Sequence, residues 1–458
     1  MRIDRICIRN FKGFEDRTLE FPRSLDAPAG GNGSVHVLIG ENGTGKTTAL
    51  DALAVAMGIW CVAFKSYGSR GIEDQEVRVL AEGTNGRVSF VPAGDAMISV
   101  RGEIDGEPAA WVRSRKGLGK NTVNSPVAGS AYGLEVARAL VKKTQEPKSG
   151  TILPLLAYYG AGRLWLEPNA PKKKKEGAPV QDKADLLRFA PYRGCLDSRC
   201  RARDLNNWLL QHDWDAYQTG EADPGYELVK KALVNCLPEA TGLRFAPKMK
   251  EVTVNFARRE EQAFSNLSDG QRNMLALVGD LAVKAVRLNH AILGDEVLRQ
   301  TPGIVLIDEI DLHLHPTWQR VVLENLRTVF PNLQFIATTH SPFIVQALHD
   351  GELVMLEGQP VPQTSNMGIE KIARGLMGVP KPEVSPRYQH QVDAAKDYLL
   401  TLEEAATAPE DKLQSYLDRL SQGIDEFADN PAYQAFLELK REAKLGARLT
   451  NNHRERSA

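Results

Sequence analysis

The sequence predicts an α/β fold with a mostly parallel sheet, an antiparallel β-rich part, a helical insertion and a helical C-terminal region. Three observations lead to this prediction. Residues 1–115 hold several short segments in which apolar and polar residues alternate, as in half-buried strands, and Asn85-Gly86 marks a tight hairpin turn. The glycine-rich segment GENGTGKT, residues 40–47, separates a strand pattern from a helix pattern. From residue 265 onward strand and helix patterns alternate, which favours a parallel sheet.

The alternating region gives the expected order of elements. It predicts a helix over 270–290, a strand over 304–308, a helix over 316–328 and a strand over 333–338, followed by the strand-like segment ELVMLEG. Both predicted strands are short and mostly apolar, and the run Ile304–Ile307 is continuous, the pattern of strands that are buried on both faces.

Shifts in composition divide the chain into four expected segments. These are an N-terminal lobe (1–164), a helical insertion (165–262), a second lobe (263–375) and a helical C-terminal region (376–458). The insertion opens with the polar segment EPNAPKKKKEGAPVQDK, which is typical of a loop, and continues with mainly helical patterns over 183–245. One apolar stripe in the C-terminal region fits a buried helix face and favours packing within the chain over a partner groove. It consists of Leu413, Leu417, Leu420, Ile424 and Phe427.

Composition excludes several classes of protein. Charged residues make up 25% of the 458 residues and hydrophobic residues 42%, the usage of an ordinary globular chain. No apolar run approaches the ~20 residues of a membrane span, and the N-terminus lacks a secretory signal. We therefore expect a cytoplasmic protein without membrane contact. The five cysteines form no C-x-x-C pair, which argues against a disulfide framework or a zinc site. With a net charge of −1, any nucleic-acid contact requires a local basic patch.

The segment GENGTGKT matches the pattern G-x-x-x-x-G-K-[ST] between a strand and a helix. Gly40, Gly43 and Gly45 let the backbone wrap around phosphate groups, so that N–H groups and the helix N-terminus face the anion. Lys46 would neutralise the β- and γ-phosphates, and Thr47 would offer its hydroxyl to Mg²⁺. The pattern predicts a site for ATP and Mg²⁺.

The segment TPGIVLIDEIDLHLHPTWQR, residues 301–320, places charge at the end of a buried strand. Asp308 follows the apolar run directly and is suited to supply the carboxylate that phosphate-bound Mg²⁺ needs. Glu309, one residue further on, is placed to orient or deprotonate an attacking water. His313 and His315 fit either a face that meets another protomer or a metal site, and the first is favoured.

Two further segments fit the same chemistry. NLSDGQRN, residues 266–273, places Ser268 and Gly270 at the start of an apolar helix, where backbone N–H groups form an anion site. IATTHSP ends another buried strand and places His340 within reach of a γ-phosphate. Ser-Asp-Gly is common turn chemistry and a lone histidine is usually structural, so both segments gain weight only from the phosphate loop.

In this order the four motifs resemble the ATP-binding cassette (ABC) ATPases, specifically the branch that contains the RecF, Rad50, SMC and OLD proteins. The N-terminal segment IRNFKGFED is similar to that branch as well. The resemblance implies a Walker A motif at Gly40–Thr48, a signature at Leu267–Gln271, a Walker B motif at Ile304–Glu309 and a switch histidine, His340. It implies catalytic roles for Glu309 and His340, metal contacts for Thr47 and Asp308, and nucleotide contacts for Asn42, Gly43, Thr44, Gly45, Lys46, Thr47, Thr48, Ser268, Gly270 and Gln271.

Two positions depart from the family pattern. Asp269 stands where the signature usually has a glycine, although the serine before it and the glycine after it are kept. No glutamine marks the Q-loop of this family. YYGAGR at 158–163 stands about where that loop is expected, and Arg163 is a candidate for its role.

A narrower resemblance extends over residues 1–60 and 150–350. AYYGAGRLW, LSDGQRNMLALVGDLA, LIDEIDLHLHPTWQR and QFIATTHSPFI are similar to predicted ATP-binding proteins of bacterial defence, including the Septu-type ATPase that works with an HNH nuclease. Sustained heptads are missing, so no long coiled-coil arm is expected. There is no D-x-D after His340 and no HNH-like cluster, so any nuclease is expected to be a separate chain.

Three functional hypotheses follow. In the first, ATP and Mg²⁺ close a head-to-tail dimer in which Ser268 of one protomer completes the site formed by Lys46 and Thr47 of another. Hydrolysis then controls a separate effector nuclease, of suspected HNH type, in anti-phage defence. In the second, the protein is a RecF-like DNA-repair ATPase that binds DNA through Lys172–Lys175 and Arg193–Arg203. In the third, a scaffold uses ATP only to assemble, which the presence of both Glu309 and His340 argues against.

Overall fold

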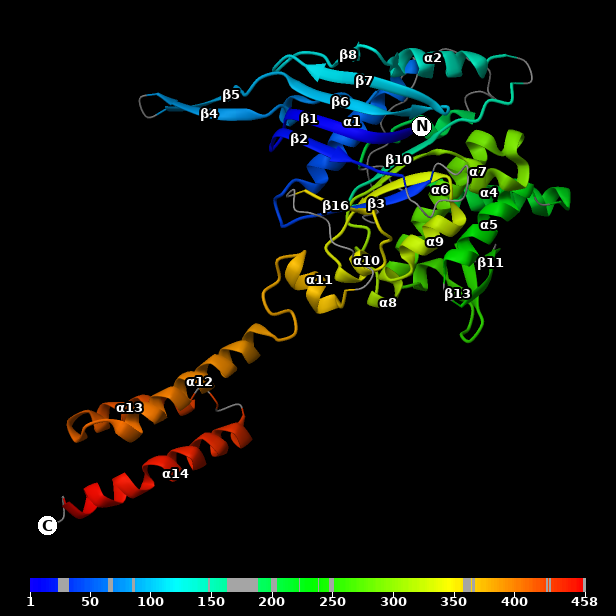
Figure 1. Cartoon of the computed structure of the whole chain (residues 1–458). Coiled ribbons are helices and arrows are strands. Elements are labelled where there is room, and N and C mark those ends of the chain that lie inside the picture. Colours follow the sequence, from blue (N-terminus) through cyan, green and yellow to red (C-terminus); the bar gives the residue numbers. More distant parts are fainter. Residues whose placement is uncertain are drawn as a thin grey trace. The chain divides into compact units, whose positions relative to one another are not determined.

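The computed structural model divides the chain into two compact units, Met1–Gly378 and Val379–Ala458. The first unit contains β-sheets with helices around them, and the second contains helices (Figure 1). The structure describes residues 1–23, 33–64, 69–84, 87–146, 149–162, 188–198, 204–221, 223–237, 239–246, 251–356, 364, 367–425, 427 and 430–455.

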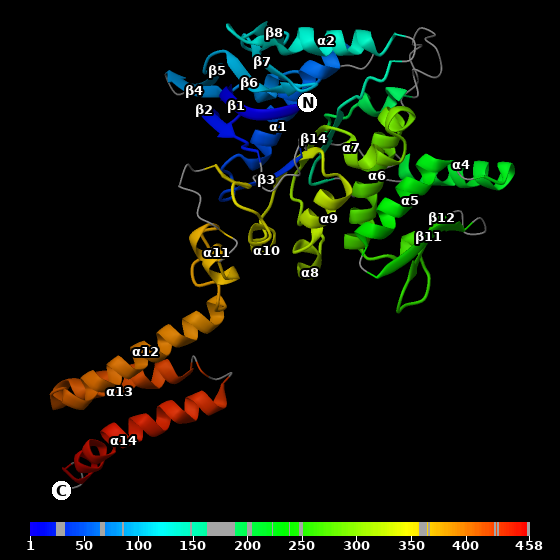
Figure 2. The ribbon, with the colours of Figure 1, turned by 45° about the vertical axis from the view of Figure 1, so that its right-hand side comes forward.

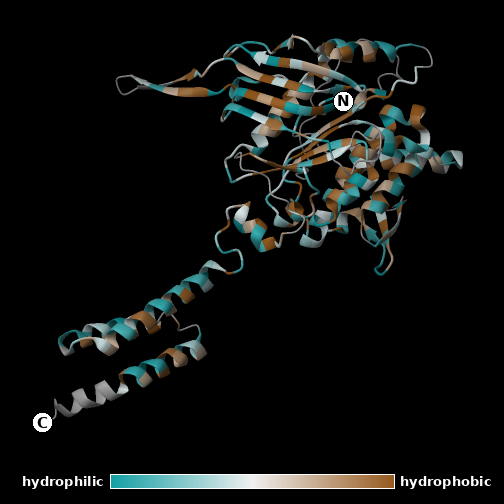
Figure 3. Cartoon of the chain, in the orientation of Figure 1, coloured by the Kyte–Doolittle hydropathy of each residue, from teal (hydrophilic) through white to brown (hydrophobic). Residues whose placement is uncertain are grey.

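The antiparallel sheet of the first unit has the strand order β2-β1-β6-β7-β8. Its strands are β1 (Arg2–Phe11), β2 (Phe14–Glu20), β6 (Ala96–Ile104), β7 (Glu107–Arg115) and β8 (Val123–Pro126), with the short β9 (Ala131–Tyr132) parallel to β7. Hydrophobic and hydrophilic residues alternate along these strands (Figure 3), the pattern of a sheet with one buried face. β4 (Val79–Thr84) and β5 (Arg87–Pro92) form a separate antiparallel ribbon, and the turn expected at Asn85-Gly86 lies outside the described residues.

The parallel sheet carries the functional site. Its order is β10 (Leu155–Tyr159), β14 (Gly303–Ile307), β15 (Leu333–Thr338), β3 (Ser34–Ile39) and β16 (Leu353–Met355), and each neighbouring pair is parallel. Every residue of β3, β10, β14 and β15 is buried, as their short apolar runs predict. Because β15 lies between β3 and β14, the carboxyl ends of these three strands meet at one edge of the sheet.

Helix α1 (Lys46–Ala63) begins directly after the glycine-rich segment and contacts strands of both sheets (Figures 1 and 2). Its small and apolar side chains are buried from Ala49 to Cys61. Within the described residues α1 alone is long and apolar enough to cross a membrane, but 78% of that stretch is buried inside the fold. Its apolar composition therefore serves the core of the first unit, where α2 (Gly133–Lys143) packs against it.

The remaining helices of the first unit surround the parallel sheet. α6 (Asp269–Leu293) contacts β10, α4 (Asp204–Thr219) and α5 (Pro224–Cys236). A small antiparallel sheet of β11 (Ala240–Ala246), β12 (Glu251–Phe256) and β13 (Gln262–Ala263) adjoins α5 (Figure 2). The short helical segments are η1 (Asp74–Glu76), η2 (Ala190–Tyr192), η3 (Phe264–Asn266), η4 (Gly294–Glu296), α7 (Val297–Gln300), α8 (Pro316–Gln319), α9 (Val322–Val329), α10 (Pro342–Gln346) and α11 (Ile369–Gly375).

Two elements differ from the sequence prediction. Residues 240–246 form β11 and not part of a helix, because they pair with β12, where Leu243 lies opposite Val254. The helix predicted over 316–328 is broken into α8 and α9. At the break, the side-chain amide of Gln319 donates to the carbonyl of Leu314 at 2.8 Å and accepts from the hydroxyl of Ser341 at 2.6 Å. Both differences involve partners that a local periodicity cannot include.

In the part of the second unit that the structure describes, three helices form a core of their own. These are α12 (Pro386–Thr407), α13 (Glu410–Asp425) and α14 (Pro431–Glu455). The predicted stripe on α13 packs within the chain, as expected: Leu413, Leu420, Ile424 and Phe427 are buried, and Leu417 is half-buried. Tyr398 and Leu402 of α12 and Leu437 and Leu445 of α14 complete this core.

Candidate nucleotide-binding site

The phosphate loop, residues 40–47, connects the end of β3 to the first turn of α1. Gly43 and Gly45 have φ angles of 87° and 97°, in the left-handed region that glycine adopts at little cost. A Cβ on Gly45 would lie 2.6 Å from the ring of Phe14, and one on Gly40 would lie 2.6 Å from the hydroxyl of Thr44. The glycines are therefore needed for the shape of the loop itself.

Lys46 is the first residue of α1 and lies back over the loop. Its ammonium group donates to the carbonyls of Gly40 at 2.7 Å and Glu41 at 3.0 Å. No side chain caps the start of α1, where Gly45 is the N-cap residue, so its first N–H groups face the loop. Asn42 is exposed in the loop, and Thr48 is half-buried. A helix N-terminus with a lysine beside it has the charge and the donors to hold phosphate groups.

The metal edge, defined as Thr47, Asp308 and Thr338, brings together residues from α1, from the end of β14 and from the end of β15. Asp308 is buried, and its two carboxylate oxygens accept hydrogen bonds from Thr47 at 3.0 Å and from Thr338 at 2.6 Å. Its backbone N–H donates to the carbonyl of Tyr159 at 2.8 Å. The structure thus joins the two residues predicted to contact metal. A hydroxyl and a carboxylate are hard oxygen ligands, which fit Mg²⁺ that also binds phosphate oxygens.

Glu309 follows Asp308 in a strained backbone conformation. Its φ angle is 50°, which costs a residue with a side chain on the order of 1 kcal/mol. Thr338 holds this bend, because its hydroxyl accepts from the N–H of Glu309 at 2.8 Å and its carbonyl accepts from the N–H of Ile310 at 3.0 Å. The bend ends the regular alternation of the strand, so the Glu309 side chain follows Asp308 in a half-buried position at the same edge.

His340 leaves the sheet between the metal edge and the phosphate loop, because it follows β15, the strand between β14 and β3. Its side chain is exposed, and its backbone N–H donates to a carboxylate oxygen of Asp311 at 3.3 Å. The same oxygen accepts from the hydroxyl of Thr339 at 2.5 Å. Asp311 therefore fixes the backbone from which His340 projects.

The signature end, defined as Ser268, Gly270 and Gln271, forms the start of α6. Ser268 and Gln271 cap each other: the serine hydroxyl accepts from the N–H of Gln271 at 3.3 Å, and the glutamine side chain accepts from the N–H of Ser268 at 3.1 Å. A Cβ on Gly270 would lie 2.7 Å from the carbonyl of His313. Ser268 is exposed, and within the described residues no hydrogen bond joins the signature end to the phosphate loop of the same chain.

The two histidines of the Walker B segment take part in local structure. His315 is the N-cap residue of α8, and its Nδ1 accepts from the N–H of Thr317 at 3.4 Å. His313 has a φ of 62° and is exposed. No group of three or more histidine, cysteine or acidic side chains within the described part of the chain is arranged to hold a metal by itself. A metal held by Thr47 and Asp308 would take its other ligands from phosphate oxygens or water.

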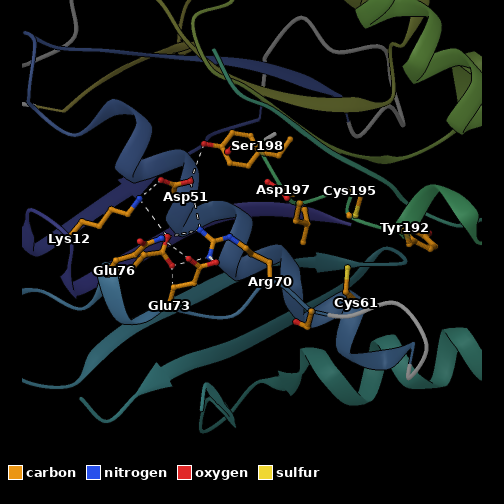
Figure 4. Close-up of a pocket in the computed structure, with 15 residues that line it drawn as sticks. Lys12, Asp51, Cys61, Arg70, Glu73, Glu76, Tyr192, Cys195, Asp197 and Ser198 are labelled. Carbon is orange, nitrogen blue, oxygen red and sulfur yellow. Dashed lines mark hydrogen bonds and ion pairs between the residues drawn. The ribbon is translucent and has the colours of Figure 1, made fainter. Parts of the chain in front are cut away.

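A pocket of about 590 Å³ lies beside α1 (Figure 4). In one part of it Lys12 lies 2.5 Å from Asp51 and 3.6 Å from Glu76, while the Arg70 guanidinium binds Glu76 with two hydrogen bonds. Tyr158 donates to Asp51 at 3.1 Å, and its pKa is raised by burial first and by the charge of Asp51 second. None of the residues 40–48, all of which the structure describes, lines this pocket.

Two family models and several known proteins match the sequence of this chain. Residues 5–213 match a family described as "AAA domain", and residues 184–346 match one described as "AAA domain, putative AbiEii toxin, Type IV TA system". "Retron Ec83 probable ATPase" from Escherichia coli is 24% identical over an alignment of 420 residues that covers 78% of this chain and 72% of that protein. "Septu protein PtuA" from Bacillus mycoides (strain KBAB4) is 26% identical over an alignment of 362 residues that covers 77% of this chain and 40% of that protein.

Other similarities are shorter or concern the fold. "Retron Vc95 probable ATPase" from Vibrio cholerae serotype O1 biovar El Tor is 43% identical over 96 residues, which span only 18% of that protein and 21% of this chain. A solved SMC head domain from Thermotoga maritima is 17% identical, with 76% of this chain and 92% of that chain covered and a TM-score of 0.40.

The sheet order, the phosphate loop and the metal edge define the first unit as an ABC-type ATPase head, with a parallel sheet, an antiparallel sheet and a helical C-terminal region beyond it. In sequence the chain is related to the retron ATPases and to Septu PtuA, and this relationship supports the assignment of an ABC-type ATPase fold.

Some site features lay beyond sequence reasoning. Thr338 and Asp311 were not predicted as site residues, although both stand in predicted motifs. Their signal was present as the first threonine of IATTHSP and the second aspartate of LIDEID, but their partners lie on another strand or loop. Several predicted residues lie outside the described part of the chain. These are the Q-loop candidate Arg163 and, from the predicted DNA-binding segments, Lys172–Lys175 and residues 199–203.

Proposed function

We propose that the chain binds ATP with Mg²⁺ and hydrolyses it. The observation that carries this proposal is the hydrogen bond between Thr47 and Asp308, which lie 261 positions apart, with Glu309 directly after Asp308. A phosphate loop alone supports only nucleotide binding. A carboxylate beside the hydroxyl of that loop adds a metal position, and a second carboxylate adds a base for hydrolysis.

The residues divide the work by position. Lys46 and the first N–H groups of α1 bind the β- and γ-phosphates. Thr47 and Asp308 would hold Mg²⁺, which when bound neutralises phosphate charge. Glu309 orients the attacking water and accepts its proton. His340, which leaves the sheet between these groups, donates a hydrogen bond to the γ-phosphate.

The signature end supports a head-to-tail dimer. Ser268 is exposed at the start of α6, and the serine with the first N–H groups of the helix offers donors to an anion of another protomer. Each of two ATP molecules is then held between Lys46 and Thr47 of one protomer and Ser268 of the other. Contacts to the γ-phosphate favour the closed dimer with ATP over the dimer with ADP, because ADP lacks this group.

In the cytoplasm, this cycle controls a separate effector nuclease, of HNH type, in anti-phage defence. Two observations support this part of the proposal. The relatives that align over most of the chain are a retron ATPase and Septu PtuA, and the sequence itself contains no recognisable nuclease motif.

The first experiment compares ATP turnover of the wild-type protein with that of Glu309→Gln. Loss of the base is expected to lower kcat by about 100-fold or more, while ATP binding is kept. Glu324→Gln is the matched control, because Glu324 is an exposed acid that pairs with Arg327 on α9. Equal turnover of wild type and Glu309→Gln would remove Glu309 from the mechanism.

The second experiment uses the same variant to find the partner. Tagged Glu309→Gln protein is purified from its native host with ATP and Mg²⁺, and co-purifying chains are identified by mass spectrometry. A stoichiometric nuclease is the expected result. Recovery of DNA without a nuclease, released by moderate salt, would favour the RecF-like alternative.

A further inference from the structure

Tyr159 is the last residue of β10 and takes part in two different networks. Through its backbone carbonyl it accepts the N–H of Asp308 at 2.8 Å, next to the metal edge. Through its hydroxyl it donates to a carboxylate oxygen of Asp280 on α6 at 2.5 Å. One buried residue therefore touches both the Walker B aspartate and the helix that begins with the signature end.

The contact on α6 is a charged cluster with little exposure. Lys284 donates to the same oxygen of Asp280 at 2.5 Å, and its ammonium lies 5.2 Å from the centre of the Tyr159 ring. The side chains of Lys284 and Asp280 are only 11% and 16% exposed. Hydrogen bonds to a largely buried charge are stronger than those between neutral groups, and the loss of one partner leaves the charge less well solvated.

Helix α6 contacts the parallel sheet and its adjoining loops at several positions along its length. Near its start, Asn273 donates to the carbonyl of Leu312 at 3.1 Å. Near its end, Asn289 bonds both the N–H and the carbonyl of Leu153 at 2.8 Å, just before β10 begins. Of these contacts, the one at Asp280 reaches the residue whose carbonyl holds Asp308.

The helix links this contact to the signature end. Asp280 lies eleven positions after Asp269, which at about 1.5 Å per residue is roughly 16 Å of helix. The helix between them carries a continuous buried face, including Met274, Leu275 and Val278. A force on Ser268 is therefore carried to Asp280 by a packed, rigid element.

We propose that Tyr159 is a positioning residue that couples the signature end to the metal edge. When Ser268 engages the γ-phosphate of another protomer, α6 shifts or stiffens, and the hydroxyl of Tyr159 passes this change to the backbone that holds Asp308. Hydrolysis thereby becomes sensitive to dimer closure. This inference rests on the proposed function, since it assigns a regulatory contact to the same nucleotide site.

The test removes one hydroxyl. Tyr159→Phe keeps the ring and its contact with Lys284 but cannot donate to Asp280. We expect affinity for a fluorescent ATP analogue to change less than about twofold, kcat to fall about tenfold, and ATP-driven dimerisation of the Glu309→Gln protein to weaken. A split between binding and kcat is a result that a purely structural role would not give.

Tyr192→Phe is the matched control. Tyr192 is equally buried, and its hydroxyl donates at 2.8 Å to the carbonyl of Pro154, just before the same strand, with no part in the Asp280 cluster. Both variants should lose thermal stability to a similar degree. An equal fall in kcat for both variants, or wild-type kcat in Tyr159→Phe, would overturn the proposal.

A double variant tests whether Tyr159 and Asp280 act together or whether each change lowers kcat independently. Asp280→Ala removes both the oxygen that accepts from Tyr159 and the charge that binds Lys284. If the hydroxyl acts through residue 280, Tyr159→Phe combined with Asp280→Ala should lower kcat less than the product of the two single effects. Fully independent effects of the two changes would contradict the coupling.

Amide hydrogen exchange keeps this test separate from that of the proposed function. In the Glu309→Gln protein, ATP should protect the first turns of α6, over residues 269–280, and the added Tyr159→Phe change should reduce this protection. A wild-type protein that binds ATP without hydrolysing it would contradict the proposed function, while the exchange result would still decide the coupling. A chain that binds no ATP would overturn both.

Discussion

The metal edge and the signature end differ in where their polar groups find partners. At the metal edge, Asp308 binds Thr47 and Thr338, residues 261 and 30 positions away in the sequence. At the signature end, Ser268 and Gln271 cap each other within one helical turn. The metal edge is thus assembled by the fold of one chain. The signature end is capped locally, and within the described residues no hydrogen bond joins it to the phosphate loop of the same chain.

The difference follows from the supporting elements. A parallel sheet gathers the ends of β3, β15 and β14 at one edge, so distant residues meet there without any further partner. A capped helix start satisfies one of its own first N–H groups, that of Gln271, keeps the N–H groups before it available to an anion, and can remain exposed. We infer that the first region binds nucleotide in a single chain and that the second acts on nucleotide of another chain. Changes in the two regions should then have different effects on binding and turnover.

The largest expected effect is that of Lys46→Ala, which removes the cation of the phosphate loop. Loss of a charged contact to phosphate is expected to weaken ATP binding by about 100-fold, measured by titration with a fluorescent ATP analogue. Lys142→Ala, at an exposed lysine on α2, should bind ATP like the wild type. Unchanged ATP affinity in Lys46→Ala would mean that the phosphates bind elsewhere. It would contradict the inference that the phosphate loop and the metal edge bind nucleotide in a single chain.

Ser268→Arg should act on turnover without acting on binding to the single chain. The long arginine side chain would fill the space in which the serine hydroxyl meets the partner's phosphate, and losing that contact costs roughly 2 kcal/mol, which lowers turnover about 30-fold. ATP-dependent dimerisation, followed by size-exclusion chromatography with light scattering, should weaken as well. Ser130→Arg places the same side chain at an exposed turn away from α6 and should have no effect. A Ser268→Arg protein with weakened ATP affinity as a monomer would mean that the signature end contacts nucleotide of its own chain.

Thr338→Val tests whether the hydroxyl of Thr338 positions Asp308 and Glu309 for hydrolysis. The change keeps the shape of the side chain but leaves Asp308 and the N–H of Glu309 without their shared partner. The expected cost is about 1–3 kcal/mol in the free energy of unfolding and about tenfold in kcat. Thr301→Val is the control, because Thr301 is also buried and its hydroxyl accepts from Asn289 at 3.1 Å, outside the site. Loss of stability in both variants, with kcat lowered only in Thr338→Val, is the expected pattern.

Local patterns in the sequence predicted the fold class and the parallel strands correctly, because the strands are short apolar runs and the phosphate loop is a contiguous motif. The prediction of one continuous helix over 316–328 was wrong, and so was the helical pattern extended to residue 245, where the structure has a strand over 240–246. Each of these elements is decided by a partner elsewhere in the chain. The same reason explains why Thr338 and Tyr159 were not found. Their partners are fixed by strand order, and the strand order β10-β14-β15-β3 cannot be read from any single segment.

The most direct test of whether the metal edge and the signature end of different chains form one site is to mix two impaired variants, Lys46→Ala and Ser268→Arg. In a head-to-tail dimer, a mixed pair has one site in which both changes meet and one site in which neither is present. Random pairing makes about half of the dimers mixed, and each mixed dimer has one intact site of two, so about a quarter of wild-type ATP turnover should return. A mixture of Lys46→Ala with Glu309→Gln is the control. Those two residues belong to the same half of a site, so every mixed dimer has a defect in both sites and no turnover should return. If nucleotide sites were complete within one chain, neither mixture would exceed the average of its components, and the signature end would have no role in the partner's site.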